Sequence, residues 1–224
     1  MKPLPRRFIS LLLPLLLALG CTGIPFQKIT YSSLGSADPA DVLEQFKEKS
    51  PVTSQLLNTV LFQYGFRKLS GIGYIEIDPQ EEKFSLVCMN PMGMKLFDIS
   101  GAEKALECRF AIDQLRRDEV VSSIAEDVRR IYFHAAPALG ARVEKKRDRI
   151  VFRQAFGKGV LVYVFGGPDI YLAEKSYVEE GLLCWKVSFH EYAETGGKIY
   201  PKGIFYRNCT HQYTLAVELK EIMN

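Results

Sequence analysis

The sequence predicts an α+β fold in which a strongly curved antiparallel sheet, an incomplete β-barrel, is covered by two or three helices. About ten short segments with alternating apolar and polar residues occupy the chain from Gly71 to the C-terminus, and turns separate them. Helical spacing is confined to stretches within residues 38–64 and 118–132. A sheet of this size can curl around a packed core or around a cavity closed by the helices.

The first twenty residues have the pattern of a bacterial lipoprotein signal. Basic residues at positions 2, 6 and 7 precede the apolar stretch 8–20, and Cys21 follows directly. In such a leader the basic head stays in the cytoplasm, the apolar stretch enters the export machinery, and a peptidase cleaves beside small residues. We therefore expect residues 1–20 to be removed and Cys21 to be lipidated.

Residues 1–20 have two alternative interpretations besides a lipoprotein leader. A transmembrane helix is disfavoured because the stretch 8–20 has only thirteen residues and contains Pro14, whereas a span needs roughly 20 apolar residues. A secretory signal without lipid is the closer alternative. It is favoured by Ala18 and Leu19, which stand where lipoproteins more often carry Leu and then a small residue.

The anchor predicts a location and a membrane-lipid partner. Each acyl methylene buried in a bilayer contributes ~0.8 kcal/mol, so several chains on Cys21 would attach the protein durably. Thr22, rather than Asp, follows the cysteine, which favours the outer membrane with the protein facing the periplasm. Residues 21–37 are interpreted as a tether, and residues 38–224 as a single domain with a sizeable core.

Charge and cysteine spacing exclude several classes of protein. The chain has 29 Lys and Arg against 26 Asp and Glu, and the three basic residues of the leader account for the whole excess. A neutral mature chain has no bulk attraction for nucleic acid, so no nucleic-acid partner is expected. The cysteines at 88, 108, 184 and 209 form no CxxC element, so neither a metal site nor a cofactor is expected.

A pair of glycines leaves one strand register open. Gly196 and Gly197 lie midway between Cys184 and Cys209, so a symmetric hairpin would set these cysteines opposite each other and permit a disulfide. The same hairpin would oppose Lys186 to Arg207, two like charges. Reduced cysteines in another register are the alternative.

Two helices are predicted in the first part of the domain. Asp38 and Pro39 form a capped helix start, Asp41 suits the positive end of the helix dipole, and Pro51 ends the helix. A second helix over residues 56–64 is favoured by the spacing of its leucines, valine and tyrosine. The alternation of apolar residues at 60, 62, 64 and 66 is the competing strand pattern.

Period-two alternation dominates the remainder of the chain. The predicted strands cover residues 73–78, 83–88, 94–100, 105–112, 149–154, 159–165, 170–178, 182–192, 203–208 and 213–222. One helix over residues 118–132 interrupts them. One face of the strands is apolar, and the residues predicted from it to line an interior cavity are Phe84, Leu86, Phe97, Ile99, Leu106, Phe110, Trp185, Val187 and Phe189.

Several segments, in order, resemble a known envelope family. The segment NPMGMKLFDIS follows the strand KFSLVC and is preceded by SGIGYIEID, as in outer-membrane lipoprotein receptors of the LolA/LolB family. The lipidation motif, the short helix after it, and the interval between Trp185 and Pro201 are also similar to that family. The resemblance extends over most of the mature chain.

The resemblance implies a half-barrel with an apolar cavity under a helical lid, and acyl chains as cargo. It assigns Asn90, Pro91, Met92 and Gly93 to the loop whose large apolar residue delivers lipid into the membrane. It also implies an acyl-chain amphiphile or a lipoprotein as cargo and a LolA-like carrier as a candidate partner. The alternative for Met92 is a tight turn that packs on the domain.

The chain departs from the family pattern between residues 131 and 168. A second lid helix is expected there from the resemblance, but the sequence instead has a loop followed by strand-like segments. The departure favours a divergent relative with a different amphiphilic partner.

A catalytic function is not expected. The three histidines, at 134, 190 and 211, belong to no HExxH or GxSxG pattern, and the glycine pairs near 157 and 166 lack phosphate-loop spacing. Lipid binding or transfer is therefore the leading hypothesis. The alternative is a non-enzymatic, anchored scaffold of an envelope or export complex, in which the protein's own side chains fill the barrel.

Overall fold

The computed structural model describes residues 26–27, 29–102 and 105–223. Its helices and strands are α2 Pro39–Lys49, β1 Ser54–Tyr64, β2 Arg67–Asp78, β3 Lys83–Met89, β4 Lys95–Gly101, β5 Leu106–Ala111, α3 Asp118–Tyr132, β6 Arg142–Lys145, β7 Arg149–Phe156, β8 Gly159–Gly166, β9 Tyr171–Glu179, β10 Leu182–Thr195, β11 Lys198–Asn208 and β12 Tyr213–Met223. No helix among the described residues is long and apolar enough to cross a membrane.

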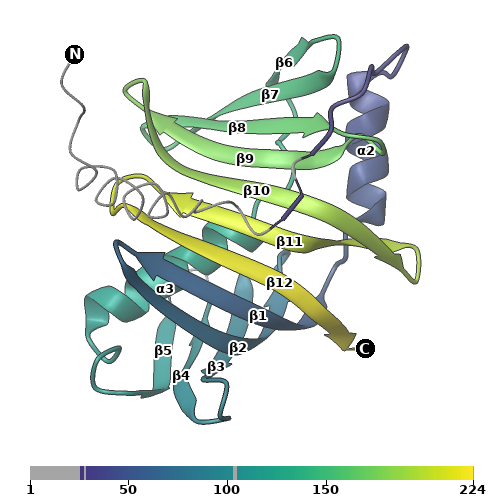
Figure 1. Ribbon diagram of the computed structural model, residues 1–224. Coiled ribbons are helices and arrows are strands. Elements are labelled where there is room, and N and C mark those ends of the chain that lie inside the picture. Colours follow the sequence, from purple (N-terminus) through teal and green to yellow (C-terminus); the bar gives the residue numbers. More distant parts are fainter. Residues whose placement is uncertain (1–25, 28, 103–104, 224) are drawn as a thin grey trace, which may run out of the picture.

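All twelve strands belong to one antiparallel sheet that remains open. The strand order is β5-β4-β3-β2-β1-β12-β11-β10-β9-β8-β7-β6, so β5 and β6 form its two edges. Figure 1 shows the sheet strongly twisted and curved, with α3 behind it and α2 at one side. The predicted fold class is therefore confirmed, with β1 and β6 added to the ten predicted strands.

Helix α2 begins and ends where its sequence signals indicate. The Asp38 side chain accepts a hydrogen bond from the Ala40 amide at 2.8 Å, and proline occupies the first turn. Val42 and Phe46 form the buried face. The ring of Phe46 meets that of Phe165 edge-on at 5.2 Å, which fixes α2 against the sheet.

The predicted second helix over residues 56–64 is wrong, because this segment is strand β1. It pairs with β2 along its whole length and with β12 on its other side. Leu56 and Asn58 are buried at a spacing of two, and Gly65 supplies the positive φ of +56° that a tight hairpin turn needs. Pairing with two neighbouring strands thus overrides the weak helical spacing.

The β10–β11 hairpin has the symmetric register set by Gly196 and Gly197. Trp185 pairs with Asn208 and Lys186 with Arg207, so Cys184 and Cys209 are the next residues out on each strand. The Cys209 amide donates to the Cys184 carbonyl at 2.8 Å. All four described cysteines are free thiols in this structure.

The interior of the curved sheet contains two apolar cores. We call the part formed by β7 to β11 under α2 the filled half, where large side chains close the space completely. Its core includes Tyr163, Phe165, Val187 and Tyr206, each fully buried. We call the part formed by β1 to β5 under α3 the hollow half, whose core is smaller and packs along the buried face of α3.

Buried polar contacts attach α3 to the sheet between the two halves. Tyr213 donates to the Asp127 carboxylate at 2.6 Å, and Arg130 donates to the Tyr206 hydroxyl at 3.0 Å. Just beyond the end of α3, the buried ammonium of Lys175 donates to the carbonyl of Phe133. Burial lowers the pKa of Lys175 to about 7.

The N-terminal segment crosses the outer face of the sheet, opposite the helices. We call residues 26–32, apart from residue 28, the strap. Phe26 lies over Gly203 and Tyr31 over Gly166, at positions where a Cβ atom would approach these rings within 2.6 Å. The guanidinium of Arg149 stacks on the Tyr31 ring at 4.4 Å. The predicted division into leader, tether and domain stays a prediction, because residues 1–25 lie outside the described part.

Candidate functional site

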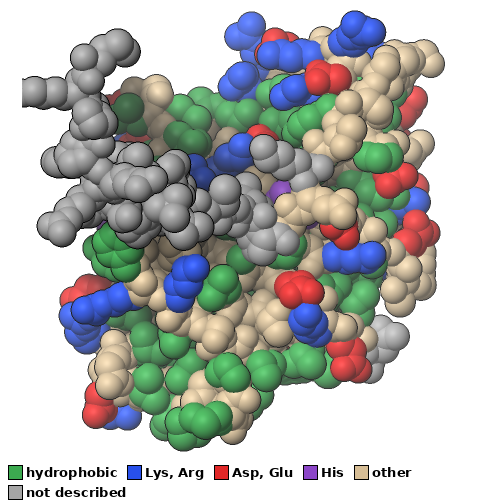
Figure 2. All heavy atoms as spheres, in the orientation of Figure 1, with side chains coloured by type: hydrophobic (Ala, Val, Ile, Leu, Met, Phe, Trp, Pro, Cys, Tyr) green, Lys and Arg blue, Asp and Glu red, His purple; other side chains and the backbone are tan. Residues whose placement is uncertain are grey.

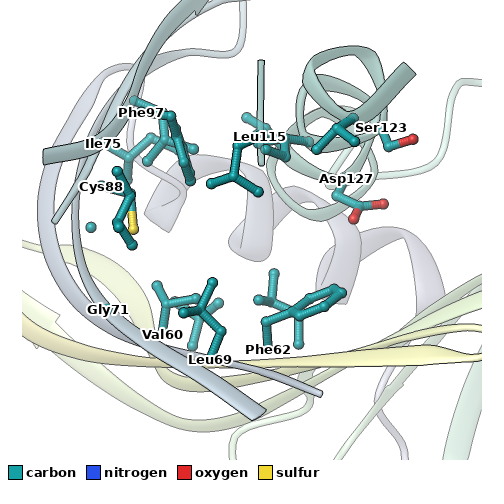
Figure 3. Close-up of a pocket in the computed structure, with 18 of the residues that line it drawn as sticks. Val60, Phe62, Leu69, Gly71, Ile75, Cys88, Phe97, Leu115, Ser123 and Asp127 are labelled. Atoms are coloured by element: carbon teal, nitrogen blue, oxygen red, sulfur yellow. The ribbon is translucent and has the colours of Figure 1, made fainter. Parts of the chain in front are cut away.

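A cavity of about 750 Å³ lies in the hollow half, between the sheet and α3. Figure 3 shows its walls: the curved sheet forms two sides, with Val60, Phe62, Ile75 and Phe97, and α3 with its preceding loop forms the third. Most lining side chains are apolar. The volume lies within the roughly 300–1,000 Å³ of small-molecule sites.

Two glycines on the inner face of β2 leave this space open. Gly71 and Gly73 stand opposite Val60 and Asn58 of β1. A Cβ atom on Gly73 would meet only Val60 at 3.4 Å and Leu86 at 3.8 Å, which is ordinary contact, so a side chain there would project into the cavity. Neither glycine has a positive φ. The missing side chain of Gly73, rather than its backbone conformation, is what the cavity uses. A Cβ atom on Gly71 would lie 2.9 Å from both the Met89 carbonyl oxygen and the Cys88 Sγ, so glycine there permits the close approach of β3.

The polar residues of the cavity are concentrated on the α3 side. Asp127 is buried and accepts the Tyr213 hydrogen bond, and burial raises the pKa of its carboxyl group, an effect that this hydrogen bond opposes. Arg117 and Glu119, at the start of α3, are exposed and also line the cavity. Leu69, another lining residue, is 46 % exposed. The cavity therefore reaches the surface near the start of β2 and α3.

The hairpin turns at this end of the sheet expose apolar side chains. The strand registers place the β1–β2, β3–β4, β7–β8, β9–β10 and β11–β12 turns at the same end. In Figure 1 the β1–β2, β9–β10 and β11–β12 turns lie on the left. We call the exposed apolar residues at the β1–β2 and β3–β4 turns the apolar rim: Phe66, Leu69, Met92 and Met94.

The opposite end of the sheet is polar. The β2–β3 turn carries Gln80, Glu81 and Glu82, and the β6–β7 turn carries Lys146, Arg147 and Asp148. Figure 2 shows charged side chains gathered at the top, over the sheet edge formed by β6 and β7, and hydrophobic ones along the lower edge, over β2 to β4. The exposed hydrophobic side chains in this view therefore lie over the part of the sheet that holds the cavity.

The segment from Asn90 to Gly93 forms the tight turn of the β3–β4 hairpin. The Asn90 side chain accepts hydrogen bonds from the amides of Met92 at 3.0 Å and Met94 at 2.9 Å, and Gly93 has a φ of +83°. Pro91 suits the second position of such a turn. Met92 is 81 % exposed, so it projects from the turn and does not pack on the domain.

The nine residues predicted to line a cavity separate into distinct groups. Leu86 and Phe97 line the cavity. Phe84 and Ile99 lie on the same face but are buried in the smaller core. Trp185, Val187 and Phe189 belong to the filled half, where neighbouring aromatic rings occupy the space in front of them.

Leu106 and Phe110 need correction, because both are exposed on the edge strand β5. Leu106 is opposite Gly101 on the inner face but lies at the outermost strand, beyond the cavity. A β-bulge sets Arg109 and Phe110 against the single residue Asp98, which turns Phe110 to the outer face. Arg109 accordingly forms an ion pair with Asp98 at 2.9 Å.

The missed lining residues come chiefly from α3 and β2, and most of the others from β1, β12 and the loop before α3. Val60 and Phe62 were hidden by the helix prediction, although their alternation with Tyr64 was the available signal. Gly71 and Gly73 gave a second signal, since two glycines at a spacing of two in a strand leave one face bare. Leu115 follows β5 in a loop with no recognisable pattern.

Other predicted features fall outside the cavity or outside the described residues. Cys21 lies in the part of the chain that is not described, so its lipidation stays a prediction. Within residues 26–27, 29–102 and 105–223, no group of three or more His, Cys, Asp or Glu side chains has metal-binding geometry. His134, just beyond α3, and His190, on the outer face of the sheet, do not line the cavity, and His211 is exposed in the β11–β12 turn.

Comparison with solved structures identifies the fold. A LolA superfamily protein from Nitrosomonas europaea superposes with a TM-score of 0.52 at 9 % identity, covering 84 % of this chain and 93 % of that one. A putative outer-membrane lipoprotein-sorting protein domain from Vibrio parahaemolyticus gives a TM-score of 0.47 at 7 % identity, covering 82 % and 90 %. No family model and no curated protein matches the chain. The chain thus has a LolA-like fold, as the sequence resemblance predicted.

Proposed function

We propose that this protein is an envelope lipoprotein that binds the acyl part of a lipid or lipoprotein in the cavity beneath α3, and that it does no chemistry on it. The observation that carries the proposal is the apolar cavity of about 750 Å³ inside a LolA-like half-barrel. Transfer of an acyl chain from water to an apolar environment is favourable by ~0.8 kcal/mol per methylene. An apolar cavity therefore binds such a chain through buried area alone. Specificity for chain type would accordingly be low.

The apolar rim gives this binding site a route to a membrane. Phe66 and Met92 are the most exposed apolar residues among those near the mouth, and they belong to neighbouring turns. An exposed large apolar side chain can enter the boundary of a bilayer, where its burial is favourable. We propose that Met92, with Phe66 beside it, brings the mouth of the cavity to the lipid surface for loading or release.

The anchored scaffold remains the second candidate, and the filled half is the observation that favours it. There the protein's own rings close the interior completely. If the protein's own side chains also closed the hollow half in solution, the protein would need no ligand to fill its interior. The two functions differ in whether the hollow half is occupied by lipid in the isolated protein.

Cavity filling tests the binding proposal directly. Gly73→Val places two methyl groups in the cavity without positive-φ strain and with no Cβ contact closer than 3.4 Å. We expect the variant to fold and to bind a fluorescent fatty acid at least about tenfold more weakly, because the apolar area open to the chain is reduced. Mass spectrometry of the purified proteins should show co-purified lipid on the wild type and less on the variant.

Glu76→Val is the matched control, since it puts the same side chain on the exposed outer face of the same strand. It should bind the fatty acid as the wild type does. Equal binding by wild type and Gly73→Val, or lipid-free wild-type protein, would contradict binding in this cavity and favour the scaffold.

Transfer is tested separately from binding. Met92→Glu should keep fatty-acid binding, because Met92 does not line the cavity, and should slow delivery of the bound lipid to vesicles. Met92→Leu, which keeps an apolar side chain, should transfer normally. Transfer by Met92→Glu at the wild-type rate would remove this turn from the mechanism.

Anchoring by Cys21 has its own test. Cys21→Ser should release the protein from the membrane fraction into the soluble periplasmic fraction. Retention of the variant in the membrane fraction would contradict the lipid anchor while leaving the cavity proposal intact.

A further inference from the structure

A second pocket, of about 300 Å³, lies on the outer face of the sheet beside the strap. It is far more polar than the cavity under α3. Its walls are Glu174 of β9, Lys186, Ser188 and His190 of β10, Phe205 and Arg207 of β11, and Ile29 and Tyr31 of the strap. The proposed lipid-binding function uses none of these residues.

The charges in this pocket are not balanced. Lys186 and Arg207 stand directly opposite each other on neighbouring strands and share the outer face. Like charges in that relation destabilise a sheet unless something neutralises them. Glu174 forms an ion pair with Lys186 at 2.7 Å, and no ion pair involves Arg207 within the described residues. One positive charge is therefore left for a ligand.

His190 adds a buried hydrogen-bonding atom to the pocket. Its side chain is buried, with 5 % of the residue exposed, and Phe26 of the strap covers its ring at 5.3 Å. Nδ1 lies 2.9 Å from the Gln27 carbonyl, an acceptor, so Nδ1 carries the proton and donates. Nε2 is buried and has no partner among the described residues. Burial lowers the pKa of His190, which keeps the ring neutral and leaves Nε2 as a lone-pair acceptor.

We propose that this pocket binds a phosphate group that carries a proton: hydrogen phosphate itself or the singly protonated form of a phosphate monoester. The guanidinium of Arg207 and the ammonium of Lys186 bind its charged oxygens, and the Ser188 hydroxyl donates to a third oxygen. The P–OH group donates to Nε2 of His190. A buried acceptor at this point selects for an anion that can donate a hydrogen bond.

Discrimination between phosphate and sulfate is the decisive measurement. Both anions have similar size and charge, but only phosphate carries a proton at neutral pH. Isothermal titration of the full mature protein at pH 7 should show inorganic phosphate bound at least tenfold more tightly than sulfate. Equal affinities, or no binding of phosphate, would overturn the proposal.

Two variants tie that preference to the pocket. Arg207→Gln should weaken phosphate binding at least tenfold, whereas Lys202→Gln, an exposed cation on the same strand outside the pocket, should leave it unchanged. His190→Phe should abolish the preference for phosphate over sulfate, because it removes the acceptor and keeps a ring against Phe26. Unaltered phosphate binding by Arg207→Gln, or a retained preference in His190→Phe, would place the bound anion elsewhere and refute the assignment.

A second probe distinguishes the two possible sources of the phosphate group, a lipid headgroup and free inorganic phosphate. Glycerol 3-phosphate is the water-soluble headgroup of phosphatidic acid, and its second pKa of about 6 means that lowering the pH from 7 to 6 supplies the protonated form. Tighter binding of glycerol 3-phosphate than of inorganic phosphate, increasing at pH 6, would assign the pocket to a lipid headgroup. Tighter binding of inorganic phosphate would assign it to the free ion.

Discussion

The filled half and the hollow half use the same strand geometry and reach opposite results. In the filled half the inward positions of β8, β10 and β11 carry Tyr163, Val187 and Tyr206, and α2 adds Phe46 from above. In the hollow half the corresponding positions of β2 carry Gly71 and Gly73, and α3 spans the space above them. The cavity lies where the inner face of β2 carries glycines in place of large side chains beneath α3.

The two helices are held by different kinds of contact. Helix α2 packs on aromatic rings, a contact that improves as the helix moves closer. Helix α3 packs Val121, Ala125 and Val128 on the smaller core. In addition, Tyr213 donates a hydrogen bond to Asp127, and Arg130 donates one to Tyr206. These buried hydrogen bonds give α3 directional attachments that the Phe46 contact of α2 does not provide.

Truncating one phenylalanine in each half should show the largest difference. Phe165→Ala removes a fully buried ring between Phe46 and Phe152 and should lower the free energy of unfolding by about 3–5 kcal/mol. Phe97→Ala removes a ring that already faces the cavity and should cost about 1 kcal/mol, because fewer contacts are lost. Urea denaturation of both variants measures the difference. Equal costs would mean that the hollow half is packed in solution.

Breaking the attachment of α3 should have the next largest effect. Tyr213→Phe removes the hydrogen bond to the buried carboxylate of Asp127 and should cost about 1–3 kcal/mol. It should also raise the pKa of Asp127 further, because that hydrogen bond opposes the effect of burial. Hydrogen exchange should then increase in α3 more than in α2. Uniform exchange in the two helices would contradict a separate attachment.

Lys175, beneath the end of α3, should make stability depend on pH. Its pKa is about 7 in the folded protein and 10.5 in the reference state, so the unfolded chain binds more protons between these values. The free energy of unfolding should therefore rise with pH from 7 to 9, by up to about 1.4 kcal/mol per pH unit. Lys175→Met should remove that part of the slope, as denaturation at pH 7, 8 and 9 can measure. An unchanged slope would assign the pH dependence to other groups.

A substitution at the rim should change stability least. Phe66 is fully exposed, so Phe66→Ser should alter the free energy of unfolding by less than about 0.5 kcal/mol. Its effect should appear only in vesicle binding, which should decrease if the rim contacts lipid. A loss of stability would show that Phe66 packs in solution and would remove it from the rim.

The sequence predicted the fold class and both described helices because their signals are local. The cap of Asp38 and the repeat over residues 118–132 act within a few residues, and the structure confirms both. The glycines at 196 and 197 likewise set the β10–β11 register, which is the symmetric one that their position predicted. Turn chemistry acts on its two flanking strands and needs no knowledge of the remaining sheet.

The cavity was predicted less well because its walls are assembled from distant parts of the chain. Only Leu86 and Phe97 of the nine predicted residues line it. Alternation reports which side of a strand is apolar, but it does not report which helix covers that side or where a bulge reverses it, as at Phe110. The seat of Phe26 on Gly203, and with it the pocket beside His190, depends on contacts across more than 160 residues.

The docking of Phe26 on Gly203 limits how far the body of the protein could stand from an anchor at Cys21. Only five peptide units separate Phe26 from Cys21, which gives a length of at most ~18 Å when fully extended. Five residue steps along β11, from Gly203 to Asn208, lead to the β11–β12 turn, a distance of ~17 Å. If Cys21 carries a lipid, the distance from Gly203 to the bilayer would be about the same as the distance from Gly203 to this end of the half-barrel. The opening would then stay close to the membrane surface.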